Sequence, residues 1–213
     1  MSNMRDLWYD WLGMNTWLFK QINSLSDIPL YASLMKFVTI FGDKKFLPII
    51  LGGIGIFVIA SIITRYVMKK GGTRNYIFLC FNIFLMLGAG LAAIHYTGDY
   101  INKNYSYPRP YIALQGEAHQ LEAQPAADAY HSFPSMHAAI ITILIFALWP
   151  AMSANFRWGG VFLIFFVCLS RVSLGVHYPM DVISGFVIAM LYMLIIRYIL
   201  YSIISAIRGV LKV

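Results

Sequence analysis

The chain has 213 residues, of which 60% are apolar and 12% charged, and its mean hydropathy is +0.68. This composition excludes an ordinary soluble globular domain and is typical of a protein with several membrane spans. The net charge of +7 does not indicate nucleic-acid binding, because most lysines and arginines lie in short connections at the ends of apolar runs. Cys80 and Cys168 both lie inside apolar runs, so we expect neither a disulfide nor a zinc site.

Residues 1–45 contain no convincing membrane span, since charged residues interrupt them and aromatic residues cluster near the start, as they do at a membrane interface. We predict two amphipathic helices that lie on the outer membrane interface and are separated at Asp27-Ile28-Pro29. The alternative is a marginal sixth span within residues 7–42, which would place the N-terminus on the inner side. The interrupting charges are Asp10, Lys20, Asp27, Lys36 and Asp43, and the aromatic anchors are Trp8, Trp11, Trp17 and Phe19.

Residues 46–213 form the membrane-embedded domain, in which five stretches approach the roughly 20 apolar residues that a helix needs to cross a bilayer. The fourth is short, so its ends must borrow neighbouring residues. The sequence therefore predicts an all-α integral membrane bundle of five to six transmembrane helices with N-terminal interfacial helices. The five stretches are Phe46–Met68, Tyr76–Thr97, Ser135–Met152, Trp158–Val172 and Pro179–Ile204.

The charges in the connections predict which side of the membrane each loop faces. If the five stretches alternate in direction, the segment Lys69–Arg74 and the turn with Arg157 fall on one side, which the positive-inside rule makes cytoplasmic. Residues 99–110, the polar loop 111–133 and residues 170–181 then lie together on the outer side. All candidate chemical groups of the chain are in those three segments.

Three clusters of functional side chains converge at the outer ends of these stretches. Lys103, Arg109 and Arg171 supply cations, and Arg side chains bind phosphate oxygens through paired donors. Ser135 begins the third stretch, where a helix N-terminus favours an anion. Together these groups indicate a phosphate site.

Two histidines and a carboxylate complete the predicted chemistry. One of His137 and His177 can attack phosphorus while the other protonates the departing oxygen. Asp181, four residues after His177 and near the start of the last stretch, suits the orientation of a neighbouring histidine. No metal or other cofactor is required, because the cations can supply the charge that magnesium would provide.

The spacing of these residues resembles the type 2 phosphatidic acid phosphatase family, which also includes vanadium haloperoxidases. Its pattern is Lys-x6-Arg-Pro, then Pro-Ser-Gly-His, then Ser-Arg-x5-His-x3-Asp. The third motif is met without deviation by Ser170, Arg171, His177 and Asp181. The second has Met136 in place of glycine, and the first is one residue short, with five residues between Lys103 and Arg109.

The resemblance implies a role for each matching residue. His177 would be the nucleophile that forms a phosphohistidine, Asp181 its orienting partner, and His137 the general acid for the leaving group. Lys103, Arg109, Ser135 and Arg171 would bind the phosphoryl oxygens.

The predicted function is metal-independent dephosphorylation of a lipid phosphate or pyrophosphate at the outer face of a bacterial inner membrane. Undecaprenyl pyrophosphate is the preferred substrate, because the N-terminal pattern around Leu18, Phe19 and Ile22 loosely resembles small undecaprenyl-pyrophosphate phosphatases. Lipid A phosphates, phosphatidylglycerophosphate and phosphate transfer to a lipid acceptor stay open. The non-enzymatic alternative is a lipid-phosphate binding membrane protein. The sequence indicates no partner besides the lipid substrate and the bilayer, and leaves the oligomeric state open.

Overall fold

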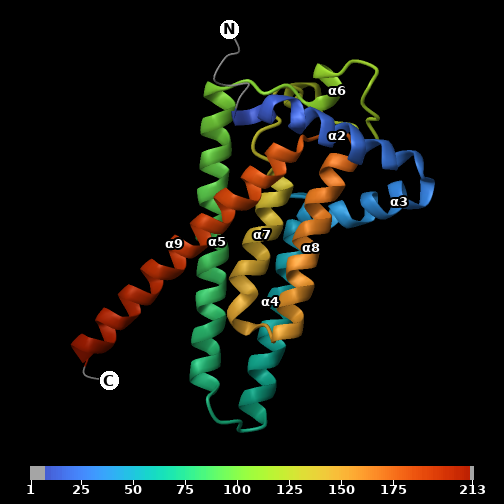
Figure 1. Ribbon diagram of the computed structural model, residues 1–213. Coiled ribbons are helices and arrows are strands. Elements are labelled where there is room, and N and C mark those ends of the chain that lie inside the picture. Colours follow the sequence, from blue (N-terminus) through green and yellow to red (C-terminus); the bar gives the residue numbers. More distant parts are fainter. Residues whose placement is uncertain (1–7, 212–213) are drawn as a thin grey trace.

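The computed structural model describes residues 8–211, and this part of the chain is a bundle of α-helices without β-strands (Figure 1). The predicted fold class is therefore confirmed. Residues 1–7, the start of the predicted N-terminal segment, lie outside the described part.

Four helices in residues 8–211 are long and apolar enough to cross a membrane, and each covers a predicted span. They are α4 (Leu47–Val67), α5 (Thr73–Asn104), α8 (Ala154–Ser173) and α9 (Pro179–Leu211). α5 has 32 residues, which makes it about 48 Å long against roughly 30 Å of hydrocarbon. Its C-terminal turns must therefore project beyond the apolar layer.

The third predicted span, Ser135–Met152, is an apolar helix at the expected place but shorter than expected. α7 (Met136–Leu148) has 13 residues and continues only as a 3-10 turn, Trp149–Ala151. Pro150 accounts for this end, because proline lacks the N–H that a continuing α-helix needs. α7 is enclosed by α5, α8 and α9, and its residues from Ala138 to Ile145 are all buried.

The alternating helices bring the three predicted clusters to one end of the bundle. Figure 1 shows the end of α5, the start of α7, the end of α8 and the start of α9 at that end, with the α4–α5 connection at the opposite end. α9 approaches the start of α7 so closely that a Cβ at Gly185 would lie 2.4 Å from the carbonyl oxygen of Ser135. This contact places the first turn of α9 against the first turn of α7.

The N-terminal region forms two short helices with the predicted break between them. α2 (Met14–Ser24) is followed by a 3-10 turn, Leu25–Asp27, and α3 (Pro29–Val38) begins after Ile28, whose backbone is extended. Helices of 11 and 10 residues are about 15 Å long, so neither can span a bilayer as the alternative of a sixth span required. Figure 1 shows α2 lying across the end of the bundle, and α3 packs against α8.

Candidate active site

His177 lies in a tight connection between α8 and α9. Gly175 has a φ of +78°, and a Cβ there would lie 2.2 Å from the carbonyl oxygen of His119. Only glycine fits this turn. The amide of His177 then donates to the carbonyl oxygen of Arg171 at 3.3 Å, and Pro179 begins α9, so that Asp181 falls in its first turn.

The His177 ring connects a carboxylate with an arginine. Its Nδ1 lies 3.5 Å from Oδ2 of Asp181, and its Nε2 lies 3.2 Å from Nη1 of Arg109. A guanidinium can only donate, so Nε2 is the acceptor and the ring proton is on Nδ1, facing Asp181. Burial, with the positive charges of Arg109 and Arg171, holds the pKa of His177 well below its usual range. His177 is thus a neutral imidazole whose unprotonated Nε2 accepts a hydrogen bond from Arg109.

Asp181 is fully buried and accepts hydrogen bonds from three directions. The hydroxyl of Tyr9 donates to Oδ1 at 2.6 Å, and the hydroxyl of Ser132 donates to Oδ2 at 2.5 Å. The amide of Tyr178 also donates to Oδ2, at 2.8 Å. These three donors fix the orientation of the Asp181 carboxyl group toward His177.

Arg109 is held beside His177 by backbone carbonyl groups. Its guanidinium donates to the carbonyl oxygens of Asp128 at 2.9 Å, Val176 at 2.8 Å and His131 at 3.3 Å. Burial, followed by the nearby charge of Arg171, lowers the pKa of Arg109. All hydrogen-bond partners of its guanidinium are neutral, so no carboxylate competes with an anionic ligand for its charge.

Arg171 already has an anionic partner. Its Nη1 donates to Oε2 of Glu122 at 2.6 Å and its Nη2 donates to Oε1 at 3.1 Å, which makes a paired interaction. Nη1 also donates to Oγ1 of Thr39 at 2.7 Å. Arg171 is 1% exposed, whereas the Glu122 side chain is 28% exposed and comes from the loop that covers the site. The Glu122 carboxylate thus lies where an anionic ligand of Arg171 would bind.

The start of α7 and the end of α8 supply polar atoms without partners. Ser135 Oγ, His137 Nε2 and Arg171 Nε are buried, and none of the three has a hydrogen-bond partner among the described residues. Buried polar atoms are normally hydrogen-bonded, so three such atoms in one region indicate a polar ligand. Ser135 is the N-cap residue of α7, as predicted, but its hydroxyl makes no capping hydrogen bond.

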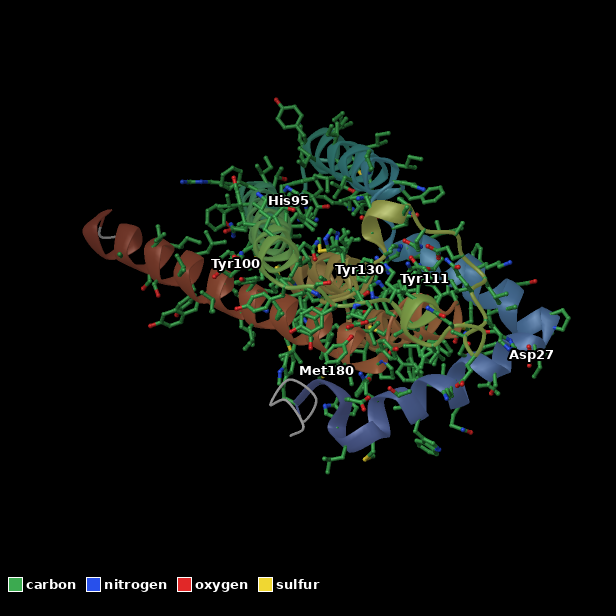
Figure 2. The ribbon with its side chains drawn as sticks, turned by 90° about the horizontal axis from the view of Figure 1, so that it is seen from above. Asp27, His95, Tyr100, Tyr111, Tyr130 and Met180 are labelled. Carbon is green, nitrogen blue, oxygen red and sulfur yellow. The ribbon has the colours of Figure 1, made fainter. Side chains whose placement is uncertain are left out.

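A cavity of about 370 Å³ lies between these groups. Arg109, His137, Arg171 and His177 line it together with residues of α5, of the covering loop and of the turn before α4. Figure 2 looks down on this end of the bundle and shows the loop with Tyr111 and Tyr130 between α4 and α5 on one side and α2 and α3 on the other. The arrangement can bind a phosphoryl group between two arginines and next to two histidines.

Comparison with known proteins agrees with this geometry. The sequence model of the PAP2 superfamily matches residues 79–204, which is more than half of the chain. The chain belongs to the PAP2 superfamily. Membership of this superfamily supports a phosphatase, and the resemblance to type 2 phosphatidic acid phosphatases is confirmed.

A solved structure shares the fold of this PAP2 protein. The crystal structure of Aquifex aeolicus LpxE matches with a TM-score of 0.61 and 19% sequence identity, over 87% of this chain and 95% of the LpxE chain. No curated protein sequence matches the chain.

Three predicted site residues do not line the cavity: Ser135 and Asp181 are fully buried, and Lys103 lies on another side of α5. α5 stays helical through Asn104, and His95, Gly98, Asp99 and Asn102 form the face of α5 that lines the cavity. Lys103 is one position further, about 100° around the helix, and it is exposed. In the PAP2 pattern Lys-x6-Arg-Pro, counting back from Arg109 gives Asn102, not Lys103, as the position of the lysine. Phosphate binding by Lys103 stays a prediction.

The structure also brings residues to the site of this PAP2 protein that sequence reasoning missed. Ser132 is adjacent to the second motif, and its position near Pro134 is the only sequence feature that could have indicated a role at the site. The other residues that sequence reasoning missed are Tyr9, Thr39, Lys44, Lys45 and Glu122. In the sequence these five look like ordinary interfacial or loop residues.

Proposed function

We propose that the protein is a lipid phosphatase in which His177 attacks the phosphorus of a membrane lipid phosphate. The observation that carries the proposal is the geometry of His177, whose Nδ1–H faces Asp181 and whose unprotonated Nε2 lies beside Arg109 at the cavity, where a phosphoryl group bound by Arg109 would meet it. This is the arrangement that a nucleophilic imidazole requires.

The reaction proceeds in two steps, formation of a phosphohistidine and its hydrolysis. The lone pair of His177 Nε2 forms a bond to phosphorus, while the bond from phosphorus to the leaving oxygen breaks and that oxygen takes the electron pair and a proton from His137. A water oxygen then forms a bond to phosphorus while the bond from phosphorus to Nε2 breaks and its electron pair returns to His177; the proton of the water passes to His137, and phosphate leaves. Arg109 and Arg171 stabilise the charge on the phosphoryl oxygens, and Asp181 stabilises the positive imidazole ring.

The substrate is a lipid, because the cavity lies at the end of helices that are apolar over a membrane's thickness. Among lipids we propose undecaprenyl pyrophosphate, with lipid A phosphates and phosphatidylglycerophosphate as the alternatives. The active site faces the outer side of a bacterial inner membrane, since Lys69, Lys70 and Arg74 lie at the opposite end of the bundle and mark the cytoplasmic side.

Phosphate release by the purified full chain in detergent tests the proposal. The three lipids are compared in the presence of EDTA, with His177→Ala as the inactive variant. His119→Gln is the matched control, because His119 is a half-exposed histidine paired with Asp27 away from the cavity. We expect metal-independent release that His177→Ala abolishes and His119→Gln retains.

Trapping of the intermediate tests the covalent step. Substrate with a ³²P label in its terminal phosphate should label the wild-type protein, and the label should be acid-labile and base-stable, as a phosphoramidate bond is. Release from none of the lipids would refute the phosphatase, whereas release without labelling would refute only the phosphohistidine.

A further inference from the structure

We propose that Lys44 and Lys45 form a second anion subsite, beside His137, which binds the phosphate that remains on the lipid when a diphosphate is cleaved. The inference rests on the proposed function and narrows its substrate class to lipid diphosphates. Both lysines lie between α3 and α4, outside the segments that carry the three motifs, and both line the cavity.

The segment that carries the two lysines is fixed against the site. Thr39 accepts a hydrogen bond from Arg171, and a Cβ at Gly42 would lie 2.7 Å from the carbonyl oxygen of His137. The side chain of Asp43 accepts a hydrogen bond from the amide of Lys45 at 2.9 Å, which orders the turn before α4. The position of Lys44 and Lys45 relative to His137 is therefore set by packed backbone.

Neither ammonium group forms an ion pair within residues 8–211. Besides Glu122 and Asp128, two other carboxylates line the cavity, and each contacts a group other than a lysine ammonium. Asp43 accepts a hydrogen bond from the amide of Lys45, and Asp99 lies 3.7 Å from Nε2 of His95. Two lysine charges thus face the cavity without a partner of their own. An anionic part of the substrate is the partner that suits them.

The two lysines lie on the side of the leaving group. In-line displacement requires the attacking and leaving atoms on opposite faces of phosphorus, so His137, as the proposed acid, marks the face opposite His177. Gly42, two residues before Lys44, packs against the backbone of His137, which places the lysine segment on this face of the cavity. When the bond from the attacked phosphorus to the bridging oxygen breaks, that oxygen takes the electron pair as part of the departing lipid phosphate, and two ammonium groups beside it stabilise this charge. An alcohol leaving group carries no phosphate charge that the two ammonium groups could stabilise.

The competing interpretation is that Lys44 and Lys45 are interfacial anchors at the start of α4. The other end of the same helix provides the matched control, because Lys69 and Lys70 follow α4 directly and lie far from the cavity. The double variants K44M/K45M and K69M/K70M remove the same charge from the two ends of one helix. Each is assayed with a polyprenyl diphosphate and with the monophosphate of the same chain, which differ only in the second phosphate.

We expect the ratio of kcat/KM for diphosphate over monophosphate to fall about tenfold or more in K44M/K45M, as the loss of charged hydrogen bonds implies, and to be maintained in K69M/K70M. Inorganic pyrophosphate should also raise the melting temperature of the wild type more than inorganic phosphate does, and K44M/K45M should lose this difference.

Three results would overturn the subsite. An equal fall of kcat/KM with both lipids would mean that the lysines bind the reacting phosphoryl group, and an unchanged kcat/KM with each lipid would mean that they are anchors. Equal stabilisation of the wild type by the two inorganic anions would contradict the subsite without reference to turnover. If His177-dependent release occurs while any of these is observed, the proposed function stands and the subsite falls.

Discussion

The hydrogen bond from Tyr9 to Asp181 should contribute to turnover, although Tyr9 lies far from the motifs in sequence. Tyr9→Phe keeps the ring, which packs among Tyr107, Phe133 and Tyr178, and removes only the hydroxyl that donates to Oδ1 of Asp181 at 2.6 Å. Oδ1 then loses its donor, while Oδ2 keeps two.

The size of the effect follows from the hydrogen bond. A hydrogen bond to a charged group contributes about 1.5–3 kcal/mol, and about 1.4 kcal/mol corresponds to a tenfold change in rate. Full expression of the upper value in the transition state would lower kcat about 150-fold. Because Ser132 and the amide of Tyr178 still hold Asp181, we expect a loss of about tenfold.

A double-mutant cycle distinguishes positioning from a general loss of structure. kcat for phosphate release is measured for the wild type, Tyr9→Phe, Asp181→Asn and the double variant. If Tyr9 acts through Asp181, the second substitution adds little to the first. Tyr31→Phe is the control, since it removes a hydroxyl hydrogen bond of 2.7 Å to Ser173 elsewhere in the N-terminal region. If Tyr9→Phe lowered kcat by the same factor in the wild type and in Asp181→Asn, the two residues would act independently and the reasoning would be refuted.

Three further predictions concern the charges of the cavity. Glu122→Gln should bind inorganic phosphate about three- to tenfold more tightly, because glutamine leaves Arg171 an acceptor without competing charge. Weaker inhibition by phosphate would contradict this expectation. Glu117→Gln is the control, since Glu117 lies in the same loop but pairs with Lys20. Nitrogen-15 NMR of histidine-labelled protein, assigned with His177→Gln, should show His177 as a neutral ring with the proton on Nδ1 at pH 6, because its lowered pKa keeps it unprotonated there; an imidazolium signal at that pH would count against the site. Lys103→Met should keep kcat/KM within about twofold, since its side chain is exposed; a loss of a hundredfold would restore Lys103 as a phosphate ligand.

The arrangement of the helices follows from the sequence wherever apolar length decides it. The four long spans were predicted at their places, although α5 and α9 each continue seven residues beyond the predicted end, and the break at Asp27-Ile28-Pro29 is marked by proline. α7 is different, because a buried helix and a spanning helix have the same apolar composition. Only packing against three neighbours explains why 13 residues suffice.

The active site was predictable where function requires a fixed local spacing. His177 lies in the connection four residues before Asp181, and the structure places the two side chains 3.5 Å from each other. Contacts between distant segments leave no such spacing. Tyr9 and Glu122 were indistinguishable from an interfacial aromatic residue and a solvated loop residue, and the exposure of Lys103 depends on how far α5 continues as a helix.

The hydrogen bond between Tyr9 and Asp181 joins residues 172 positions apart. During translation Tyr9 emerges early, whereas Asp181 emerges only after all but the last helix has been synthesised. The carboxylate that orients His177 therefore acquires its full set of donors only once the last helix has been inserted beside the first segments. On the proposed function, a ribosome-bound or truncated chain lacks a competent nucleophile, so phosphatase activity reports the completed insertion of the whole protein.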